Sequence, residues 1–394
     1  VRAIHLAFAM FLTFLVFGRS RKARKQRTTL TFLDVGLASI AALAVLYGVI
    51  DYEGISSRAG DLLTRDLVIG SFIIVILLEA TRRAVGKPLP IIATVFIAYS
   101  FFSEYMPEII SFKNASLAKV VNKLSLSTGG IFGVPLDVSA TTVFLFVLFG
   151  AMLDKAGGSQ YFIQCAYSLL GRFKGGPAKA AVLASGLTGM VSGSSIANTV
   201  TTGTFTIPLM KKSGYSGIKA GAIEVASSTN GQLMPPIMGA AAFIMAEYCN
   251  LTYFEVVRAA IIPALISYLA LIYITHLEAS KLGLKGGPKE ELPLLKPLLL
   301  GGIPFLVPLG FLLYQLMVMR RSPQLSAYYA ICALMGVMVA RELWFGQREQ
   351  RSFISSIKNA GLLITDSLVA GAQSMIAIAV AVATAGIIVG IVTL

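Results

Sequence analysis

The segment Ser192-Gly193-Ser194-Ser195-Ile196-Ala197-Asn198 places a polar centre inside an apolar stretch that runs over residues 176–212. Two lysines precede the first apolar arm and two follow the second, at Lys174, Lys179, Lys211 and Lys212. Each arm is about 15 residues long, whereas a helix needs about 20 to cross a membrane. Lysines at both ends are expected on the same side of the membrane. The pattern predicts a re-entrant helical hairpin with its polar tip near the middle of the bilayer; one full span is the alternative.

A second broken segment occupies residues 217–250. It holds the polar run Ser227-Ser228-Thr229-Asn230-Gly231-Gln232, followed by Pro235 and Pro236. Proline lacks a backbone donor and clashes with the preceding helical turn, so carbonyls over residues 226–231 are expected to be freed towards a cavity. A half-helix starting after Pro236 would point its positive N-terminal end at an anionic solute. A simple proline kink is the alternative.

The two polar centres carry the oxygen atoms that hard cations prefer. Hydroxyl, amide and carbonyl oxygens can replace the water shell of sodium, and they suit a transition metal less well. Close helix packing is the alternative explanation for the serines and glycines. Packing alone gives no reason for Asn198, so the sequence favours a cation site.

The composition is that of a membrane protein. Apolar residues make up 56% of the 394 residues and charged residues only 13%, a balance that excludes an ordinary soluble domain. The apolar residues fall into blocks close to the length of a membrane span, at residues 1–17, 31–50, 66–84, 88–106, 132–152, 256–276, 298–319 and 325–340.

The net charge of +14 does not indicate nucleic-acid binding. The strongest basic run, residues 19–27, lies between two apolar blocks without interleaved aromatics, as a cytoplasmic loop does. Alternating loop charge then predicts a four-helix module over residues 1–112 and a larger module over residues 113–394. The chain begins with Val1 and ends in an apolar run at Leu394, so we expect both ends to continue in a longer protein.

The sequence shows no catalytic pattern. Its two histidines, His5 and His276, stand apart, and no Gly-Lys-Ser/Thr nucleotide loop is present. We therefore expect no enzyme and no nucleotide partner, and a transporter of this kind must use an ion gradient. Acids within apolar segments, Glu224, Glu247 and Asp366, keep an intramembrane enzyme open as an alternative.

Two stretches carry a family resemblance. Residues 192–210, SGSSIANTVTTGTFTIPLM, and residues 231–247, GQLMPPIMGAAAFIMAE, closely resemble the membrane subunit of tripartite ATP-independent periplasmic (TRAP) transporters. The second stretch, with residues 78–83 and 144–150, is most similar to the TAXI branch, in which the small and large membrane subunits are fused.

This resemblance implies an all-α polytopic protein of the prokaryotic cytoplasmic (inner) membrane. It implies a four-helix scaffold module joined to an elevator-type core of two inverted repeats, the second incomplete in this chain. It also implies sodium-coupled uptake of a small carboxylate that a periplasmic TAXI-type binding protein delivers. A passive anion channel and a membrane scaffold subunit are the alternative functions.

The candidate site residues come from the hairpin tip and the unwound centre. The expected sodium ligands are Ser192, Gly193, Ser194, Asn198, Ser227, Ser228, Asn230 and Gly231. The expected substrate contacts are Ser195, Asn198, Thr201, Thr202, Gln232, Pro235 and Pro236. Sodium is the only cofactor expected, and no catalytic residue is assigned.

Overall fold

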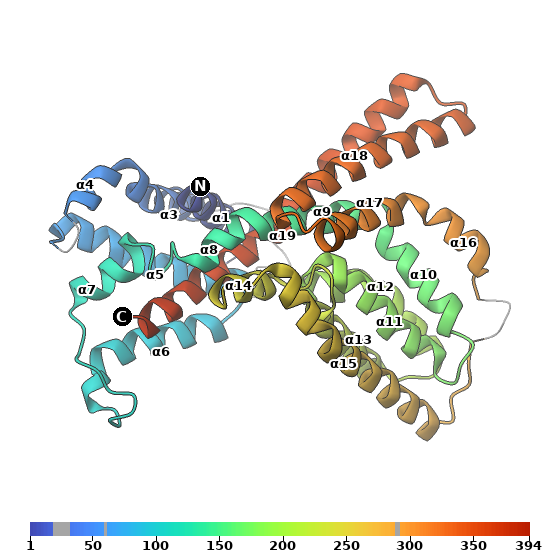
Figure 1. Ribbon diagram of the computed structural model, residues 1–394, viewed down its shortest axis with the longest axis horizontal. Helices are drawn as coiled ribbons and strands as arrows, with labels where there is room; N and C mark the ends of the chain where they lie inside the picture. Colours follow the sequence, from blue (N-terminus) through green and yellow to red (C-terminus); the bar gives the residue numbers. More distant parts are fainter. Residues whose placement is uncertain (19–31, 59–60, 288–291) are drawn as a thin grey trace. The chain divides into compact units, whose positions relative to one another are not determined.

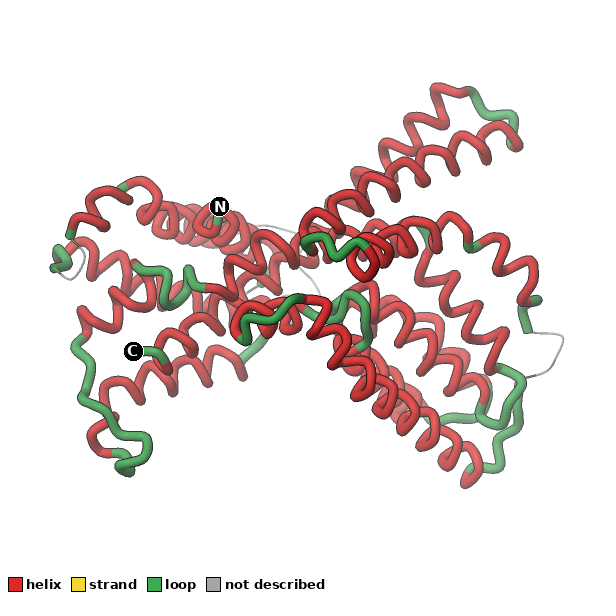
Figure 2. The backbone as a smooth tube through the Cα atoms, in the orientation of Figure 1, coloured by secondary structure: helices red, strands yellow, loops and turns green. Residues whose placement is uncertain are grey.

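A computed structural model describes residues 1–18, 32–58, 61–287 and 292–394. Helices connected by loops make up this described part, which contains no β-strand (Figure 2). The all-helical fold expected from the apolar blocks is therefore confirmed. The basic run at residues 19–27 lies outside the described residues. The chain forms two compact units, one of residues 1–141 and 375–394 and the other of residues 142–374.

The first unit contains the four N-terminal apolar blocks as helices, together with shorter helices and the end of α19. Its α-helices, labelled in Figure 1, are α1 (Arg2–Val16), α3 (Phe32–Ile50), α4 (Tyr52–Ser57), α5 (Thr64–Ala84), α6 (Pro88–Phe102), α7 (Leu117–Val121), α8 (Val134–Val138) and the second half of α19 (Phe353–Val392). The short helical turns η1 (Ser103–Tyr105) and η2 (Asn122–Leu126) also belong to it.

Polar contacts of Thr81 and Arg83, both on α5, lie inside the apolar core of this unit. Thr81 of α5 lies 2.6 Å, hydroxyl to hydroxyl, from Thr384 of α19, so these distant parts of the sequence pack together. Arg83 donates to Asp34 of α3 at 2.9 Å and to Glu79 at 2.8 Å. A buried arginine is tolerated in such a core because carboxylates satisfy its donors.

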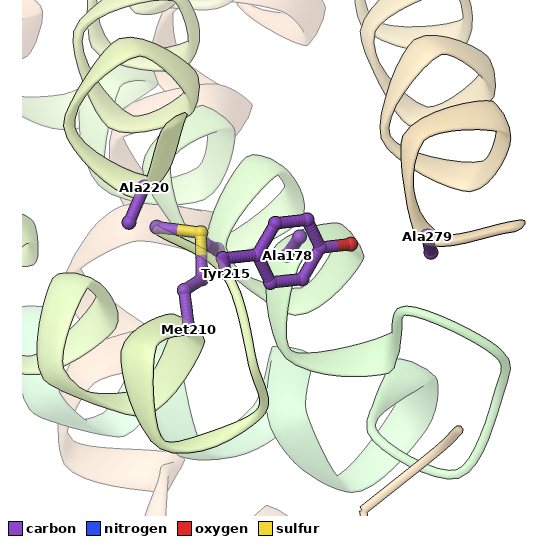
Figure 3. Packing of buried hydrophobic residues seen from close by; sticks show 6 residues of the cluster. Ala178, Met210, Tyr215, Ala220 and Ala279 are labelled. Atoms are coloured by element: carbon purple, nitrogen blue, oxygen red, sulfur yellow. The ribbon is translucent and has the colours of Figure 1, made fainter. Parts of the chain in front are cut away.

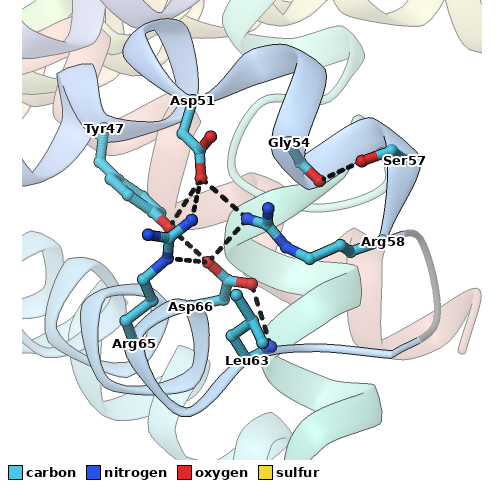
Figure 4. Close-up of polar contacts among 8 residues, drawn as sticks. All are labelled: Tyr47, Asp51, Gly54, Ser57, Arg58, Leu63, Arg65 and Asp66. Carbon is cyan, nitrogen blue, oxygen red and sulfur yellow. Dashed lines mark hydrogen bonds and ion pairs between the residues drawn. The ribbon is translucent and has the colours of Figure 1, made fainter.

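A network of charged residues closes the connection between α3 and α5 (Figure 4). The buried Asp66 carboxylate accepts hydrogen bonds from the Tyr47 hydroxyl, from the Leu63 backbone N–H at 3.1 Å and from Arg58 at 3.4 Å. Arg58 also donates to Asp51 at 2.8 Å and holds the pKa of that carboxyl below its ordinary value. This contribution to stability is present above the ordinary carboxyl pKa and is lost as the pH falls through the lowered value.

Replacing Asp66 by alanine is expected to destabilise the protein by about 1–3 kcal/mol, because Arg58 and the Leu63 N–H lose a partner. Thermal unfolding of the purified protein measures the effect. The control is Asp61→Ala in the same connection, because Asp61 is exposed. Equal unfolding temperatures for the two variants would show that the network adds no stability.

The second unit contains both broken segments. Its elements are α9 (Phe144–Lys155), α10 (Gly158–Leu170), α11 (Gly176–Ser192), α12 (Ser195–Lys212), α13 (Gly217–Asn230), η4 (Gly231–Leu233), α14 (Ala240–Tyr248), α15 (Tyr253–Lys281), α16 (Leu295–Gly301), α17 (Ile303–Leu313), η6 (Tyr314–Val318), α18 (Pro323–Arg348) and the first half of α19; η3 (Ser139–Val143) spans the division between the units.

An apolar cluster fastens the open end of the hairpin (Figure 3). Met210 and Tyr215 pack with alanines of the neighbouring helices, and all members are buried: Ala178, Ala181, Met210, Tyr215, Ala220 and Ala279. The cluster ties the start of α11 and the end of α12 to the start of α13. Since α13 then runs back along α12, its C-terminal end lies near the hairpin tip.

The helices agree with a multi-pass membrane protein and correct two boundaries. Among the described residues, six helices are long and apolar enough to span a membrane, or seven if the bent pair α16–α17 is counted as one span. The block predicted at residues 298–319 is not one straight helix, because α16 and the following helix meet at a bend of 63°. The apolar run that ends at Leu394 belongs to the 40-residue α19, which begins at Phe353.

Candidate functional site

The polar tip of the hairpin is a two-residue turn between α11 and α12. Gly193 ends α11 with φ of 63°, a left-handed conformation that glycine adopts without strain. Ser194 begins α12, and its hydroxyl accepts the Ala197 backbone N–H at 3.3 Å as an N-cap. α11 and α12 therefore form the two arms of a helical hairpin, with 17 and 18 residues, and its re-entrant position in the membrane stays a prediction.

The second segment breaks later than its sequence suggested. α13 continues to Asn230 and η4 follows it, so the unwound backbone is Met234–Gly239 and not residues 226–231. The Ser227 carbonyl, expected to be freed, accepts the Tyr268 hydroxyl at 2.9 Å. The expected half-helix is present as α14, which begins after Gly239. The helix persists because the disruption by proline acts on the turn before Pro235, not on earlier turns.

The hairpin tip and the unwound segment lie in backbone contact. A Cβ atom on Gly193 would come within 2.8 Å of the Met238 carbonyl oxygen, and one on Gly239 within 3.3 Å of the Gly193 carbonyl oxygen. Gln232 bridges the two segments on the exposed side by donating to the Ser195 hydroxyl at 2.6 Å. Tyr253 of α15 fixes the unwound backbone by donating to the Pro236 carbonyl at 2.9 Å.

Gly193→Ala is expected to destabilise the protein by at least about 1–2 kcal/mol, because alanine is strained in the left-handed region and its Cβ would displace Met238. The unfolding temperature of the purified protein measures the change. Gly221→Ala in α13 is the control, since a Cβ there meets no atom within 4 Å. Equal unfolding temperatures for the two variants would show that the tip does not need this close contact.

A buried polar core lies behind the tip, between α11, α12 and α13. The Asn198 amide donates to the Ser185 carbonyl at 2.8 Å and to the Ser185 hydroxyl at 3.1 Å. The Ser185 hydroxyl lies 2.9 Å from that of Ser228. Glycines make room for this contact, because the backbones of α11 and η4 touch at Gly189 and Gly231, beside the Asn198 amide.

Glu224 stands at the centre of this core with its side chain fully buried. Its carboxylate accepts from the Thr202 hydroxyl, from Thr206 at 2.5 Å and from Ser228 at 3.0 Å. The Ser185 hydroxyl approaches it at 3.5 Å. In the part of the chain that the structure describes, no lysine, arginine or histidine pairs with Glu224. Glu247, the other acid noted beside it in the sequence, is exposed.

Two buried oxygen atoms at the tip accept no hydrogen bond. Among the described residues, only four buried side-chain polar atoms have no partner, and two of them are Asn198 Oδ1 and Ser192 Oγ. Buried polar atoms are nearly always satisfied, so such atoms need an explanation. Oxygen ligands of this kind fit a hard cation, and both residues belong to the expected sodium set.

The structure brings only part of the expected residues together. The Ser194 hydroxyl caps α12, the Ser227 hydroxyl donates to the Ile223 carbonyl at 2.7 Å, and Asn230 donates to Ser267 of α15 at 2.6 Å. Of the expected substrate contacts, Thr202 faces the buried core, whereas Gln232 is exposed and Ser195, Thr201 and Pro235 are half-buried.

Ser185, Thr206 and the central position of Glu224 were missed from the sequence. One signal was available: Asn198, Thr202 and Thr206 recur at intervals of four, which places them on one face of α12. Ser185 had no such signal, because it stands in a run of small residues typical of helix packing.

A helical hairpin and a proline-broken helix that meet beside a buried polar core define a class of protein: multi-pass membrane proteins of the transporter type. The chain belongs to one family of that class. Residues 72–394 match the model of the tripartite ATP-independent periplasmic transporter, DctM component. The chain is therefore a multi-pass protein of the prokaryotic inner membrane.

Curated relatives agree with this assignment. The chain is 29% identical over 180 residues to the C4-dicarboxylate TRAP transporter large permease protein DctM of Vibrio cholerae, covering 45% of this chain and 37% of that protein. It is 30% identical over 176 residues to the sialic acid TRAP transporter permease protein SiaT of Haemophilus influenzae, covering 45% of this chain and 26% of that protein. It is 24% identical over 208 residues to the isethionate TRAP transporter permease protein DctMQ of Oleidesulfovibrio alaskensis, covering 53% of this chain and 29% of that protein. The chain thus spans less than half the length of these relatives.

Proposed function

We propose that this chain forms part of a sodium-coupled secondary transporter that takes up a small carboxylate-containing solute. The observation that carries the proposal is the pair of unpartnered buried oxygens, Asn198 Oδ1 and Ser192 Oγ, at the hairpin tip. Oxygen atoms from one hairpin turn can replace part of the water shell of sodium. The family membership supports a transport role and gives no support to an enzyme.

The solute would bind where the tip meets the unwound segment. α14 begins at Ala240, directly after the unwound residues, so its positive N-terminal end favours an anionic group nearby. Ser195, which is half-buried, and the exposed Gln232 offer a hydroxyl and an amide at the same place. The names of the relatives include dicarboxylate, sialic acid and isethionate, all of which are anions, in keeping with this chemistry.

The partner is proposed to be a periplasmic solute-binding protein of the TAXI type. In this scheme residues 1–112 form the small-subunit-like scaffold, fused to a transport core that begins at residue 113. The matched family region starts at residue 72, inside α5, so it also takes in residues 72–112 of this scaffold; the described helices α1, α3 and α4 precede it. The core would carry the solute by an elevator movement that takes the hairpin and α13 together.

Uptake of radiolabelled carboxylates, including succinate and glutamate, into proteoliposomes tests the proposal. The protein is assayed with and without its binding protein, and with an inward sodium gradient or with choline in place of sodium. Uptake that requires both the binding protein and the sodium gradient supports the proposal. Flux that is indifferent to both would point to a passive anion channel, and the absence of any flux would leave the scaffold role.

A further inference from the structure

We infer that Glu224 supplies the negative charge that balances the cation at the hairpin tip, without being one of its ligands. The inference rests on the proposed sodium coupling and adds to it a residue that the oxygen-ligand pattern did not include. It follows from three observations on the polar core: the hydroxyl groups around Glu224, the missing counter-charge and the connection to Asn198.

Four hydroxyl groups converge on the Glu224 carboxyl group, from Ser185, Thr202, Thr206 and Ser228. Thr202 reaches one carboxyl oxygen and Thr206 the other, and Ser228 adds a contact to the first. An ionised carboxylate accepts hydrogen bonds only, and hydroxyl groups are donors that it can use. The Thr202 and Thr206 hydroxyls also contact the backbone carbonyls of Asn198 and Thr202, so each has two acceptors within reach of its single proton.

Hydroxyl groups alone leave the charge uncompensated. A buried ionised carboxylate is costly unless it is paired, and no described cationic side chain pairs with Glu224. The charge of a bound cation would provide the missing balance. In a region of low dielectric, opposite charges several ångströms apart still attract strongly, so direct ligation is not required.

Two short connections join Glu224 to Asn198. Ser185 lies 3.5 Å from the Glu224 carboxylate and 3.1 Å from the Asn198 amide nitrogen, hydroxyl oxygen to each atom. The Thr202 hydroxyl contacts Glu224 and also donates to the backbone carbonyl of Asn198 at 2.7 Å. The two hydrogen bonds from the Asn198 amide nitrogen to Ser185 fix the orientation of the side chain. The Oδ1 atom is therefore held in place and free to bind a cation. Glu224 is thus a positioning residue that acts through its field.

Two substitutions of Glu224 separate charge from shape. Glu224→Gln keeps the shape and removes the charge, whereas Glu224→Asp keeps the charge and shortens the side chain. The charge role predicts that Glu224→Gln raises the half-saturating sodium concentration at least about tenfold, and that Glu224→Asp raises it less. A purely structural role predicts the reverse order, because glutamine fills the same volume and aspartate leaves a gap.

The measurements use sodium as the probe, at constant ionic strength with choline. Sodium-dependent thermal stabilisation of the purified protein reports binding, and sodium-dependent uptake in proteoliposomes reports coupling. Glu247→Gln is the matched control, because Glu247 is an exposed acid outside the core, and it is expected to behave as wild type.

The outcomes distinguish this inference from the proposed function. If wild-type protein shows no response to sodium, the proposed function fails. If wild type responds and Glu224→Gln has an unchanged half-saturating sodium concentration, only the role of Glu224 is overturned. An unchanged sodium response together with a lost pH dependence of uptake would also overturn it, in favour of a proton-binding role. A larger rise of the half-saturating sodium concentration in Glu224→Asp than in Glu224→Gln would show that Glu224 has only a structural role.

Discussion

Replacing both Pro235 and Pro236 by alanine is expected to abolish uptake. The two prolines stand in the unwound segment Met234–Gly239 between η4 and α14. Proline is about 3 kcal/mol less favourable than alanine inside a helix, so the double substitution removes roughly 6 kcal/mol of resistance to helix formation. α13 could then continue towards α14.

A continuous helix would dismantle the contact on which the site depends. The carbonyl of Met238 would leave Gly193, and Gln232 would leave Ser195, since both contacts need the extended backbone. Uptake in proteoliposomes measures the loss, and correct insertion is checked by the elution of the purified protein as a single species. Pro263→Ala is the matched control, because Pro263 is an exposed proline inside α15. Uptake by the double variant at the wild-type rate would show that the break is not required.

Asn198→Ala is expected to lower the apparent affinity for sodium at least about tenfold, with insertion unchanged. The substitution removes the unpartnered Oδ1 atom and also the amide that anchors it to Ser185. A lost charge-assisted ligand of this kind is worth about 1.5–3 kcal/mol, which corresponds to roughly a tenfold to a hundredfold change.

The sodium dependence of uptake and of thermal stability measures this change. Thr204→Ala serves as the control, because Thr204 is exposed on the same helix and its hydroxyl donates only locally, to the Thr201 carbonyl at 2.9 Å. If Asn198→Ala keeps the wild-type sodium dependence, the hairpin tip is excluded from the ion site, whereas the family membership would stand.

Local sequence signals predicted the helices and their breaks well where the residue type by itself decides the backbone conformation. The apolar blocks predicted the membrane helices, the polar centre at residues 192–198 marked the tip of the hairpin, and Pro235 with Pro236 marked the second break. The position of that break was misjudged because serines and threonines do not unwind a helix by themselves. In α13 their hydroxyls donate to carbonyls of the preceding turn, as Ser227 does to Ile223, and the helix continues.

The candidate site was predicted less completely, because the direction of a side chain depends on its neighbours. Ser228 and Asn230 stand two positions apart in one polar run, yet Ser228 joins Glu224 and Asn230 turns to Ser267 of α15. Successive helical residues point about 100° apart, so a run of polar residues spreads around the helix. Only packing decides which of them meet.

The sequence by itself determined the class of protein and the places where its helices break, because hydropathy, proline and glycine act over short stretches of chain. The tertiary structure decided which polar groups converge. Ser185 and Glu224 lie 39 positions apart, and they meet at Asn198 only because α13 returns along the hairpin. The carboxyl group at the centre of the polar core is therefore placed by the packed helices, since no local pattern brings Glu224 beside the tip.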